Sequence, residues 1–238
     1  MKLVQNLVFF MPLDVGKDLV YISRMEVPDQ APVMVLPNVT LFPQALLPLH
    51  IFEPRYRQML QEVLHSHRSF IVAMRKPGAT RENLFSVAGL GLVRVCVDNA
   101  DGTSHLILQG VSRVALTKTV QYRPYRVCRI QALETPSRDS VTIDALMAKV
   151  RDLVTERIEQ ELPAIRGKSK SVPVKEIVSC LEKLQDPDRV ADLVSWSLLR
   201  GAMERQTILE TIEVEPRLKH LIHFLMAEII QERKNKSK

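Results

Sequence analysis

The sequence predicts an α+β protein: a small, curled or closed β-barrel with one packed helix, followed by an α-helical bundle. Two observations support this fold class. Several short strand-like runs separated by turns occupy residues 84–133, and closure into a barrel would remove the exposed edges of such strands. From residue 141 onward the apolar residues instead recur at the spacing of a helix. The strand pattern stops at Thr135-Pro136-Ser137, which we predict to be the domain boundary.

The predicted organisation has four parts. An amino-terminal extension covers residues 1–24, a barrel subdomain 25–136, a helical subdomain 137–234 and a basic tail 235–238. Met25 would be a natural start for the barrel subdomain. Our hypothesis is therefore that residues 1–24 are either a flexible extension or the result of an over-extended start and not made in the cell. Mass spectrometry of the native protein tests this, because a peptide that ends before Met25 would contradict a start at that methionine.

The composition is that of a globular protein, since 46% of the 238 residues are hydrophobic and 25% are charged. The net charge of +6 permits weak attraction to nucleic acid or acidic partners but is modest for this length. Cys96, Cys128 and Cys180 are far apart and form no CxxC pair, so neither a zinc site nor a disulfide framework is indicated. We expect all three thiols to be buried, which fits a reducing cytoplasm, and no apolar run reaches the roughly 20 residues that a membrane span needs. We therefore expect a cytoplasmic protein.

Four prolines punctuate residues 33–60, and the apolar pieces between them are too short for helices. They are Pro37, Pro43, Pro48 and Pro54. Because proline lacks a backbone N–H and fixes its own φ, this stretch cannot be a helix interior or a central strand. We predict a strand at 33–36, then a bent apolar segment over residues 37–53 that must lie on other parts of the fold. This is called the proline segment below, and a helix is predicted to open at its end, at Pro54.

Apolar spacing predicts the other elements of the barrel subdomain. A helix over residues 55–67 has one apolar face, made of Tyr56, Met59, Leu60, Val63 and Leu64. Strands are predicted at 69–75, through the alternating Val93, Val95 and Val97, from Leu106, at 111–120 and at 125–133. The turn residues 99–102 join two of these strands, and Gly110 marks a bulge or bend.

Five helical stripes follow the boundary. Their apolar residues span 143–158, 174–184, 190–198, 208–212 and 218–229. Asp186 and Pro187 suit the N-cap and first helical position of the third helix, and Gly201 can end it. Across both subdomains twelve residues are predicted to be buried. They are Leu36, Leu49, Ile51, Phe52, Phe70, Val72, Val95, Leu108, Val127, Leu193, Leu209 and Leu225.

No constellation of catalytic or metal-ligating residues stands out, so we expect no metal, no cofactor and no enzymatic activity. Gly167-Lys168-Ser169 resembles the end of a phosphate-binding loop, but such a loop needs a preceding strand and a glycine five residues earlier, where Leu162 stands. A polar linker between two helices is therefore the favoured interpretation. The histidines do not form a metal site, because no set of them and other ligand residues has the required spacing.

Two ordered motifs resemble the Lon-type amino-terminal, substrate-binding domain. The first is LPNVTLFPQALLPLHIFEPRYRQM, residues 36–59. The second lies within residues 186–229, and its matching positions are Asp186, Pro187, Ala191, Asp192, Gln206, Leu209, Glu210, Arg217, Leu218 and Leu221. Three departures are mild: Val190 and Ile208 stand where the family has leucine, and Arg205 where it has lysine. Ser195 and Trp196 stand near a usual alanine pair, so a difference in local packing is expected there. The resemblance covers about residues 33–232 and implies a PUA-like β-barrel followed by an α-helical bundle.

The resemblance also implies a function. Lon proteins carry an ATPase and a serine–lysine peptidase after this domain, and neither has a counterpart motif here. We therefore expect a stand-alone, non-catalytic substrate-recognition or adaptor module. It would bind unfolded or degron-like polypeptides, and its partners would be a protease or the substrates of one. The rival hypothesis is an RNA-binding PUA-like module. Against it, only 5% of the residues are aromatic, and the sequence has no basic stripe with interleaved aromatic residues on which bases could stack.

The candidate substrate-binding residues lie at the end of the proline segment. They are Ile51, Phe52, Glu53, Arg55 and Arg57. The flanking prolines stiffen this stretch, so its side chains lose little entropy on binding, and charged residues beside apolar ones suit an extended chain. The alternative for Glu53 and Arg55, which the residue pattern favours, is an ion pair that fixes the proline segment against the helix.

Overall fold

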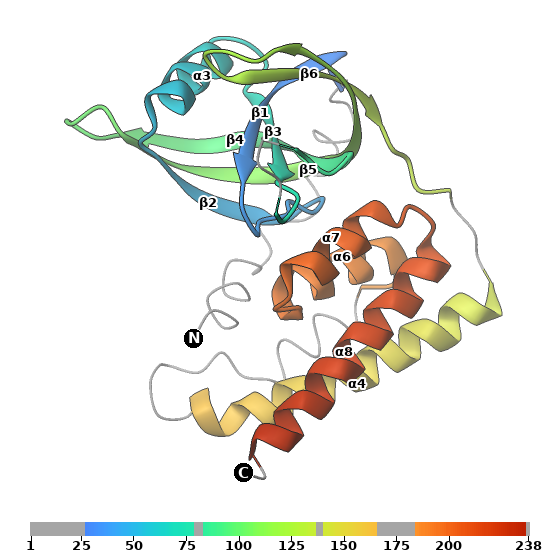
Figure 1. Ribbon diagram of the computed structural model, residues 1–238. Helices are drawn as coiled ribbons and strands as arrows, with labels where there is room; N and C mark the ends of the chain where they lie inside the picture. The colour runs from blue at the N-terminus through green and yellow to red at the C-terminus, as the bar shows by residue number, and fades with distance from the viewer. Residues whose placement is uncertain (1–26, 79–82, 137–139, 166–183, 237–238) are drawn as a thin grey trace. The chain divides into compact units, whose positions relative to one another are not determined.

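The computed structural model describes residues 27–78, 83–136, 140–165 and 184–236 (Figure 1). These residues form a mixed α/β fold with a six-stranded sheet and five helices. The chain divides after Glu134 into two compact units, called here the sheet unit and the helical unit. The predicted extension over residues 1–24, most of the predicted stripe 174–184 and the Gly167-Lys168-Ser169 triplet lie outside the described residues.

Six strands build the sheet unit, and each predicted strand has a counterpart among them. They are β1 (Gln30–Leu36), β2 (Leu46–Ile51), β3 (Ser69–Met74), β4 (Val87–Asp98), β5 (Ser104–Gln121) and β6 (Arg126–Ala132). Their order is β2-β5-β4-β3-β1-β6, and β6 also pairs with β5. The β1–β3 pair is parallel and the others are antiparallel. The predicted strand 111–120 is not separate, because it continues β5 past Gly110.

The proline segment lies against β4 and β5, which support its short apolar pieces. Leu41 and Phe42 are fully buried there. Two glycines permit this close approach: a Cβ atom at Gly89 would lie 2.0 Å from the Leu41 carbonyl oxygen, and one at Gly110 would lie 1.9 Å from that of Phe42. Pro48 lies in β2, at the end of the strand order, where a missing N–H costs no ladder bond to a further strand.

The proline segment ends in α3 (Pro54–Leu64), which begins at the predicted proline. Four of the five residues of its predicted apolar face are buried: Tyr56, Met59, Leu60 and Val63. The helix ends earlier than predicted because the chain turns sharply at Arg68. That residue has a φ of 55°, and its N–H donates back to the Val63 carbonyl oxygen at 3.0 Å.

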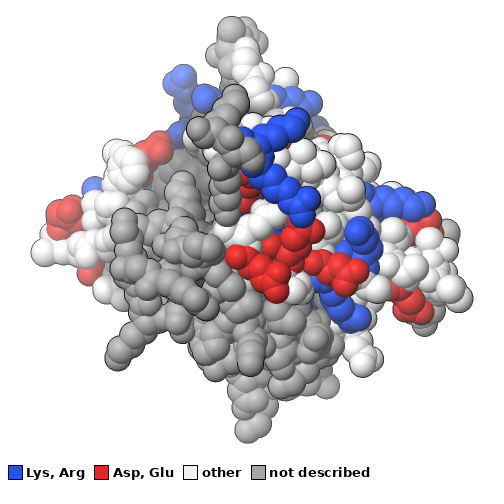
Figure 2. All heavy atoms as spheres, turned by 90° about the horizontal axis from the view of Figure 1, so that it is seen from below, with Lys and Arg blue, Asp and Glu red and all other residues white. Residues whose placement is uncertain are grey.

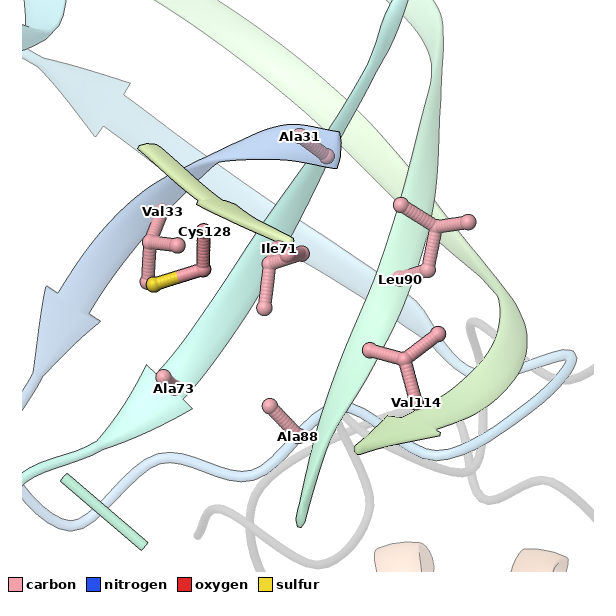
Figure 3. Packing of buried hydrophobic residues seen from close by; sticks show 8 residues of the cluster. All are labelled: Ala31, Val33, Ile71, Ala73, Ala88, Leu90, Val114 and Cys128. Carbon is pink, nitrogen blue, oxygen red and sulfur yellow. The ribbon is translucent and has the colours of Figure 1, made fainter. Parts of the chain in front are cut away.

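Five strands contribute side chains to the core of the sheet unit. The buried cluster consists of Ala31, Val33, Ile71, Ala73, Ala88, Leu90, Val114 and Cys128 (Figure 3). Figure 3 shows these side chains pointing from β1, β3, β4, β5 and β6 into a common interior. Small residues alternate with branched ones in this cluster, so the strands can approach closely around it. Cys128 packs as a small apolar side chain and is buried as predicted, whereas Cys96 is only partly buried.

The predicted core is half right. Six of its members are buried, Ile51, Phe70, Val72, Leu108, Leu209 and Leu225. Four others, Leu36, Leu49, Val127 and Leu193, are only partly buried. The predictions for Phe52 and Val95 are wrong, because their exposed fractions are 60% and 52%. Phe52 follows the last residue of β2 and lies beyond the sheet, whereas Val95 is turned outward by a β-bulge described below.

The turn at residues 99–102 joins β4 and β5 as predicted. The Asn99 N–H donates to the Thr103 carbonyl oxygen at 2.8 Å, and Gly102 takes a φ of 78° that suits glycine. The prediction for Gly110 is also confirmed, since the β4–β5 register shifts between Leu90 and Gly91, the residue that pairs with Gly110. This irregularity lies where the proline segment crosses the strands.

The described part of the helical unit contains four helices, α4 (Val141–Ile165), α6 (Pro187–Leu198), α7 (Ala202–Glu210) and α8 (Val214–Lys236). Their predicted apolar stripes are largely buried, and α4 packs along α8 (Figure 1). Asp186 caps α6 as predicted, because its carboxylate accepts from the N–H groups of Asp188 and Arg189. Gly201 does not end α6, which stops at Leu198, but serves as the N-cap of α7.

Two fully buried arginines hold the helical unit together. The Arg217 guanidinium pairs with Asp188, lies 3.5 Å from Asp192, and donates to the Thr135 hydroxyl at 3.3 Å. It thereby joins α6 and α8 to the residue at which the chain enters this unit. Arg157 of α4 pairs in the same way with Glu228 and Glu232 of α8. Buried charges that are paired like this are costly to leave without a partner.

Among the described helices, none is long and apolar enough to span a membrane.

Candidate functional site

The five candidate residues predicted from the sequence occupy the junction between β2 and α3. Ile51 is the last residue of β2, and its side chain lies in the core with an exposed fraction of 2%. Phe52 is exposed, and Glu53 is the N-cap residue of α3. Ile51 therefore supports this junction from inside, whereas Phe52 is the apolar side chain that it presents to solvent.

The charged members of the set contact one another and the fold. Arg55 Nε lies 2.9 Å from Glu53 Oε2, and both side chains are more than a third exposed. The Arg55 guanidinium also lies 4.5 Å from the ring centroid of Tyr56, whose hydroxyl accepts from the Val35 N–H at 3.0 Å. An exposed pair of this kind contributes about 0.2–1 kcal/mol, so it orients the start of α3 without dominating its stability.

Arg57 connects α3 to the tip of the β4–β5 hairpin. Its guanidinium lies over Gly102, since a Cβ atom at that glycine would be 2.0 Å from Arg57 Nη2. The hairpin tip is itself fixed by Asp101, which accepts from the Thr103 N–H at 2.9 Å and from the Thr103 hydroxyl at 2.7 Å. These hydrogen bonds lower the pKa of the Asp101 carboxyl, and the nearby His50 lowers it further. Arg57 thus packs beside a stable turn.

Beside this junction lies an apolar surface that the sequence pattern does not indicate. Strand register places Val97, His105 and His50 in one row across β4, β5 and β2, and Val95, Ile107 and Pro48 in the next. Residues that pair directly across antiparallel strands point to the same side of the sheet. We call this surface the outer strand face, and it consists of Pro48, His50, Phe52, Val95, Val97, His105 and Ile107.

Its apolar side chains are substantially exposed. The exposed fraction is 52% for Val95, 57% for Val97 and 60% for Phe52. The His50 and His105 rings stack with centroids 4.4 Å apart, and the Phe52 ring lies 5.7 Å from that of His50. Exposed β-branched and aromatic residues that adjoin one another form the kind of patch that marks an interaction site.

A single β-bulge turns the two valines outward. Val93 pairs with the buried Leu108, but Val95 pairs with Ile107, so Arg94 is an extra residue in β4. One extra residue reverses the side to which all later side chains point. Val93 is accordingly buried, whereas Val95 and Val97 are exposed. The alternation of these valines predicts one shared face, and nothing in the local pattern indicates the bulge.

The chemistry available at this surface is contact and hydrogen bonding. In the part of the chain that the structure describes, no group of three His, Cys, Asp or Glu side chains is placed to hold a metal ion. The outer strand face contains stacked imidazoles, a proline and apolar side chains, with Glu53, Arg55 and Arg57 as charged neighbours along the chain. Such a surface can bind an apolar or extended ligand, and the fold offers it without movement of the strands.

Comparison with known proteins identifies the family. The model of the ATP-dependent protease La (LON) substrate-binding domain matches residues 30–227. Among curated relatives, the Lon protease of Dictyoglomus thermophilum is 23% identical over 210 residues, which are 87% of this chain and 25% of the relative. The Lon protease of Desulfovibrio desulfuricans is 29% identical over 202 residues, 82% of this chain and 22% of that protein. The chain thus spans about a quarter of the length of these relatives.

Two solved structures show the same fold. The N-terminal domain of the Mycobacterium avium complex Lon protease matches with a TM-score of 0.66 and 16% identity, covering 83% of this chain and 98% of that one. The Lon N-terminal domain protein from Xanthomonas campestris matches with a TM-score of 0.59 and 18% identity, covering 82% and 98%. The sequence motifs, the fold and the family match agree, and the chain belongs to the Lon substrate-binding domain family.

Proposed function

We propose that this chain recognises unfolded or degron-like polypeptide segments and does so without catalysis of its own. The observation that carries the proposal is the outer strand face, where Phe52, Val95 and Val97 are exposed side by side with stacked imidazoles. The family name supports a substrate-recognition role. The partners that follow are flexible polypeptides, and a protease or its substrates in the case of an adaptor.

The outer strand face suits a polypeptide chain for physical reasons. Its two rows run across three strands, so an extended segment laid on them can place alternate apolar side chains against Val95, Val97 and Ile107. The Phe52 ring extends this apolar surface beside the charged N-terminus of α3. An apolar centre with a charged rim gives affinity for extended chains with modest selectivity.

The non-catalytic part of the proposal rests on sequence. Position 162, where a phosphate-binding loop would need glycine before Gly167-Lys168-Ser169, is leucine. The relatives named Lon protease are about four times as long as the matched region, so their activity is not transferred to this chain.

We also propose that the sheet unit is a closed, PUA-like barrel. Support comes from β6, which pairs with β1 through Gln30–Arg129 and with β5 through Val114–Ala132. Closure would fix the spacing of β2, β5 and β4, and with it the geometry of the outer strand face. Hydrogen exchange tests this proposal, because the β6 amides should be protected as strongly as those of the central β4.

The role of the charged neighbours is a second part of the proposal. We infer that Glu53 and Arg55 mainly fix the start of α3, because their side chains pair with each other at 2.9 Å. Arg57 lies over the hairpin tip and can reach a bound chain more readily. Single alanine variants of the three residues separate these roles when melting temperature and binding of an unfolded model protein are both measured. A role in fold stability lowers both together, whereas a role in binding lowers binding alone.

The decisive experiment replaces the two exposed valines. Val95→Thr/Val97→Thr keeps side-chain shape and strand propensity but makes the outer strand face polar. Full burial of a valine contributes about 1.5–3 kcal/mol, so partial burial at two positions predicts at least a fivefold loss of affinity for an uncharged, apolar peptide. Fluorescence anisotropy with such a labelled peptide measures the change. Val141→Thr/Ile230→Thr, at two exposed β-branched positions of the helical unit, is the matched control.

The result that contradicts the proposal is equal affinity in the test and control variants. The two test positions are more than half exposed, so melting temperatures should be unchanged and a loss of binding cannot be a loss of fold. Salt dependence separates polypeptide from nucleic-acid binding: apolar contact persists at about 0.5 M salt, whereas binding to phosphates falls steeply.

A further inference from the structure

A second surface of the sheet unit carries positive charge without acidic neighbours in sequence. No Asp or Glu occurs between Gly102 and Glu134, and the cations in this interval are Arg113, Lys118, Arg123, Arg126 and Arg129. Arg113 is buried, and the other four lie on the paired ends of β5 and β6 and the loop between them. We call this region, residues 117–131, the basic ribbon.

Strand register brings two of these cations together. Lys118 of β5 lies directly opposite Arg129 of β6, and Gln30 of β1 continues the row on the other side of Arg129. The neighbouring inward positions, Cys128 and Leu116, contribute to the core, so Lys118 and Arg129 point outward. Like charges that face each other across two strands destabilise the pair.

Three cations of the ribbon are not neutralised within the described structure. No hydrogen bond or ion pair joins the side chains of Lys118, Arg123 or Arg129 to any described residue. Elsewhere the protein pairs its charges: Arg157 with Glu228 and Glu232, and Arg233 with Glu156. Figure 2 shows a face with such mixed charge, on which acidic side chains gather with Lys and Arg directly beside them. Two exposed cations that face each other without a described acidic partner are available to a negatively charged ligand.

We infer that the basic ribbon binds acidic segments of polypeptide chains. This inference rests on the proposed function and names the class of segment that a second surface selects. The side chains between the cations favour a polypeptide, because the exposed Gln131 can hydrogen-bond its backbone and the half-buried Val127 offers apolar contact. Single-stranded nucleic acid would need a series of free aromatic rings for stacking. The ribbon has one exposed ring, Tyr122, and the Arg126 guanidinium already lies 5.5 Å from its centroid.

The spacing of the ribbon matches an extended chain. Side chains on one side of a strand recur at about 6.6–6.8 Å, and neighbouring strands lie about 4.7–4.9 Å apart. A segment with Asp or Glu at alternate positions can therefore set successive carboxylates against Lys118, Arg129 and the cations near the loop. Because these cations are exposed, each ion pair with the segment adds little affinity. Their main effects are faster association with acidic segments and discrimination between acidic and neutral ones.

The test compares two labelled twelve-residue peptides by fluorescence anisotropy at about 50 mM salt, where exposed charges are weakly screened. One has Glu at alternate positions, and the other has Gln at the same positions. An exposed ion pair changes affinity by up to about fivefold, so two pairs predict that the wild-type protein binds the Glu peptide about tenfold more tightly. Lys118→Ala/Arg129→Ala should bring this ratio below about twofold.

Two variants control for fold and charge. Lys149→Ala/Lys234→Ala removes the same charge from exposed positions of the helical unit and should leave the ratio unchanged. Lys118→Arg/Arg129→Lys keeps the two charges and should also retain it. Removing a like-charge pair should not lower the melting temperature of the alanine variant, so lost discrimination is distinguishable from unfolding.

Three results would overturn the inference: a wild-type ratio near one, a ratio that survives Lys118→Ala/Arg129→Ala, or a ratio that falls equally in the Lys149→Ala/Lys234→Ala control. Tighter, ribbon-dependent binding of a single-stranded oligonucleotide of equal charge would also overturn it, in favour of nucleic acid. The uncharged apolar peptide, measured in parallel, reports on the proposed function at the outer strand face. Its binding can fail while the Glu preference stands, or the reverse, so the two failures are separable.

Discussion

Gly110→Ala tests whether the proline segment depends on its close contact with β5. The added Cβ atom would lie 1.9 Å from the Phe42 carbonyl oxygen, whereas ordinary contact begins at 3.4 Å. The obstacle is backbone, so the whole segment has to move away from the strand. Two hydrogen bonds hold it there at 2.8 Å: the Gln44 N–H donates to the Gly110 carbonyl oxygen, and the Gly110 N–H donates to that of Ala45.

The expected cost combines two effects. Overpacking costs about 1–3 kcal/mol, and each of the two weakened backbone hydrogen bonds costs about 0.5–1.5 kcal/mol, so we expect a loss of about 2–6 kcal/mol in the free energy of unfolding. Urea denaturation measures this as a lower midpoint with an unchanged m-value.

Gly78→Ala is the control for this substitution. Gly78 has a φ of 71° but no heavy atom within 4 Å of the added Cβ, so only the left-handed conformation is penalised, by about 1–2 kcal/mol. Equal or smaller destabilisation by Gly110→Ala would show that the segment does not need this contact.

Three further predictions concern other parts of the chain. Arg217→Ala should destabilise the helical unit by about 3–5 kcal/mol in urea denaturation, because it leaves Asp188 and Asp192 without their buried partner; a cost below about 1 kcal/mol would contradict that role. Burial and the hydrogen bond to Glu62 raise the pKa of Tyr125 to about 12 from an ordinary value of 10.0, so the folded state favours the neutral phenol. The resulting stabilisation is complete below pH 10 and is lost as pH rises to about 12, and unfolding free energies measured across this window should show a steeper decline in the wild type than in Tyr125→Phe. The purified protein should hydrolyse neither ATP nor casein, and Lys168→Ala should change nothing measurable; nucleotide binding that this substitution abolishes would refute our interpretation of the Gly167-Lys168-Ser169 triplet.

Local chemistry was enough to predict the elements whose ends depend on one residue. Pro54 begins α3 and Asp186 caps α6, because a missing N–H and an accepting carboxylate act on the adjacent backbone alone. Apolar spacing predicted the buried face of α3 for the same reason, since the helix repeat is fixed by the backbone. Gly201 shows the limit: its position after α6 suits a helix end, but it is the next helix that uses it, as N-cap.

Strand facing could not be predicted in the same way, because register belongs to a pair of strands. The alternation of Val93, Val95 and Val97 is compatible with one buried face, and only the pairing with β5 reveals that Arg94 is an extra residue. The outer strand face was missed for this reason. The basic ribbon had a visible sequence signal, the acid-free interval between Gly102 and Glu134, but the opposition of Lys118 and Arg129 again required the register.

The distal family motif has a structural explanation that its spacing does not reveal. Asp192 and Arg217 lie far apart in sequence but meet in the buried ion pair of the helical unit. Their spacing therefore reports packing between α6 and α8, and we assign them no role in binding. The proximal motif is different, because its apolar residues divide between the core, with Ile51, and solvent, with Phe52.

The proline segment affects both the stability of the sheet unit and the position of the outer strand face. Its hydrogen bonds to Gly110 end at Ala45, and β2 begins at the next residue, so this contact sets where β2 lies along β5. The same pairing places His50 against His105 and leads the chain to the exposed Phe52. A change at Gly110 should therefore weaken both folding and peptide binding, whereas a change at Val95 or Val97 should weaken binding alone. The inward side of these strands holds the sheet unit together, and the bulge in β4 leaves their outward side available to a ligand.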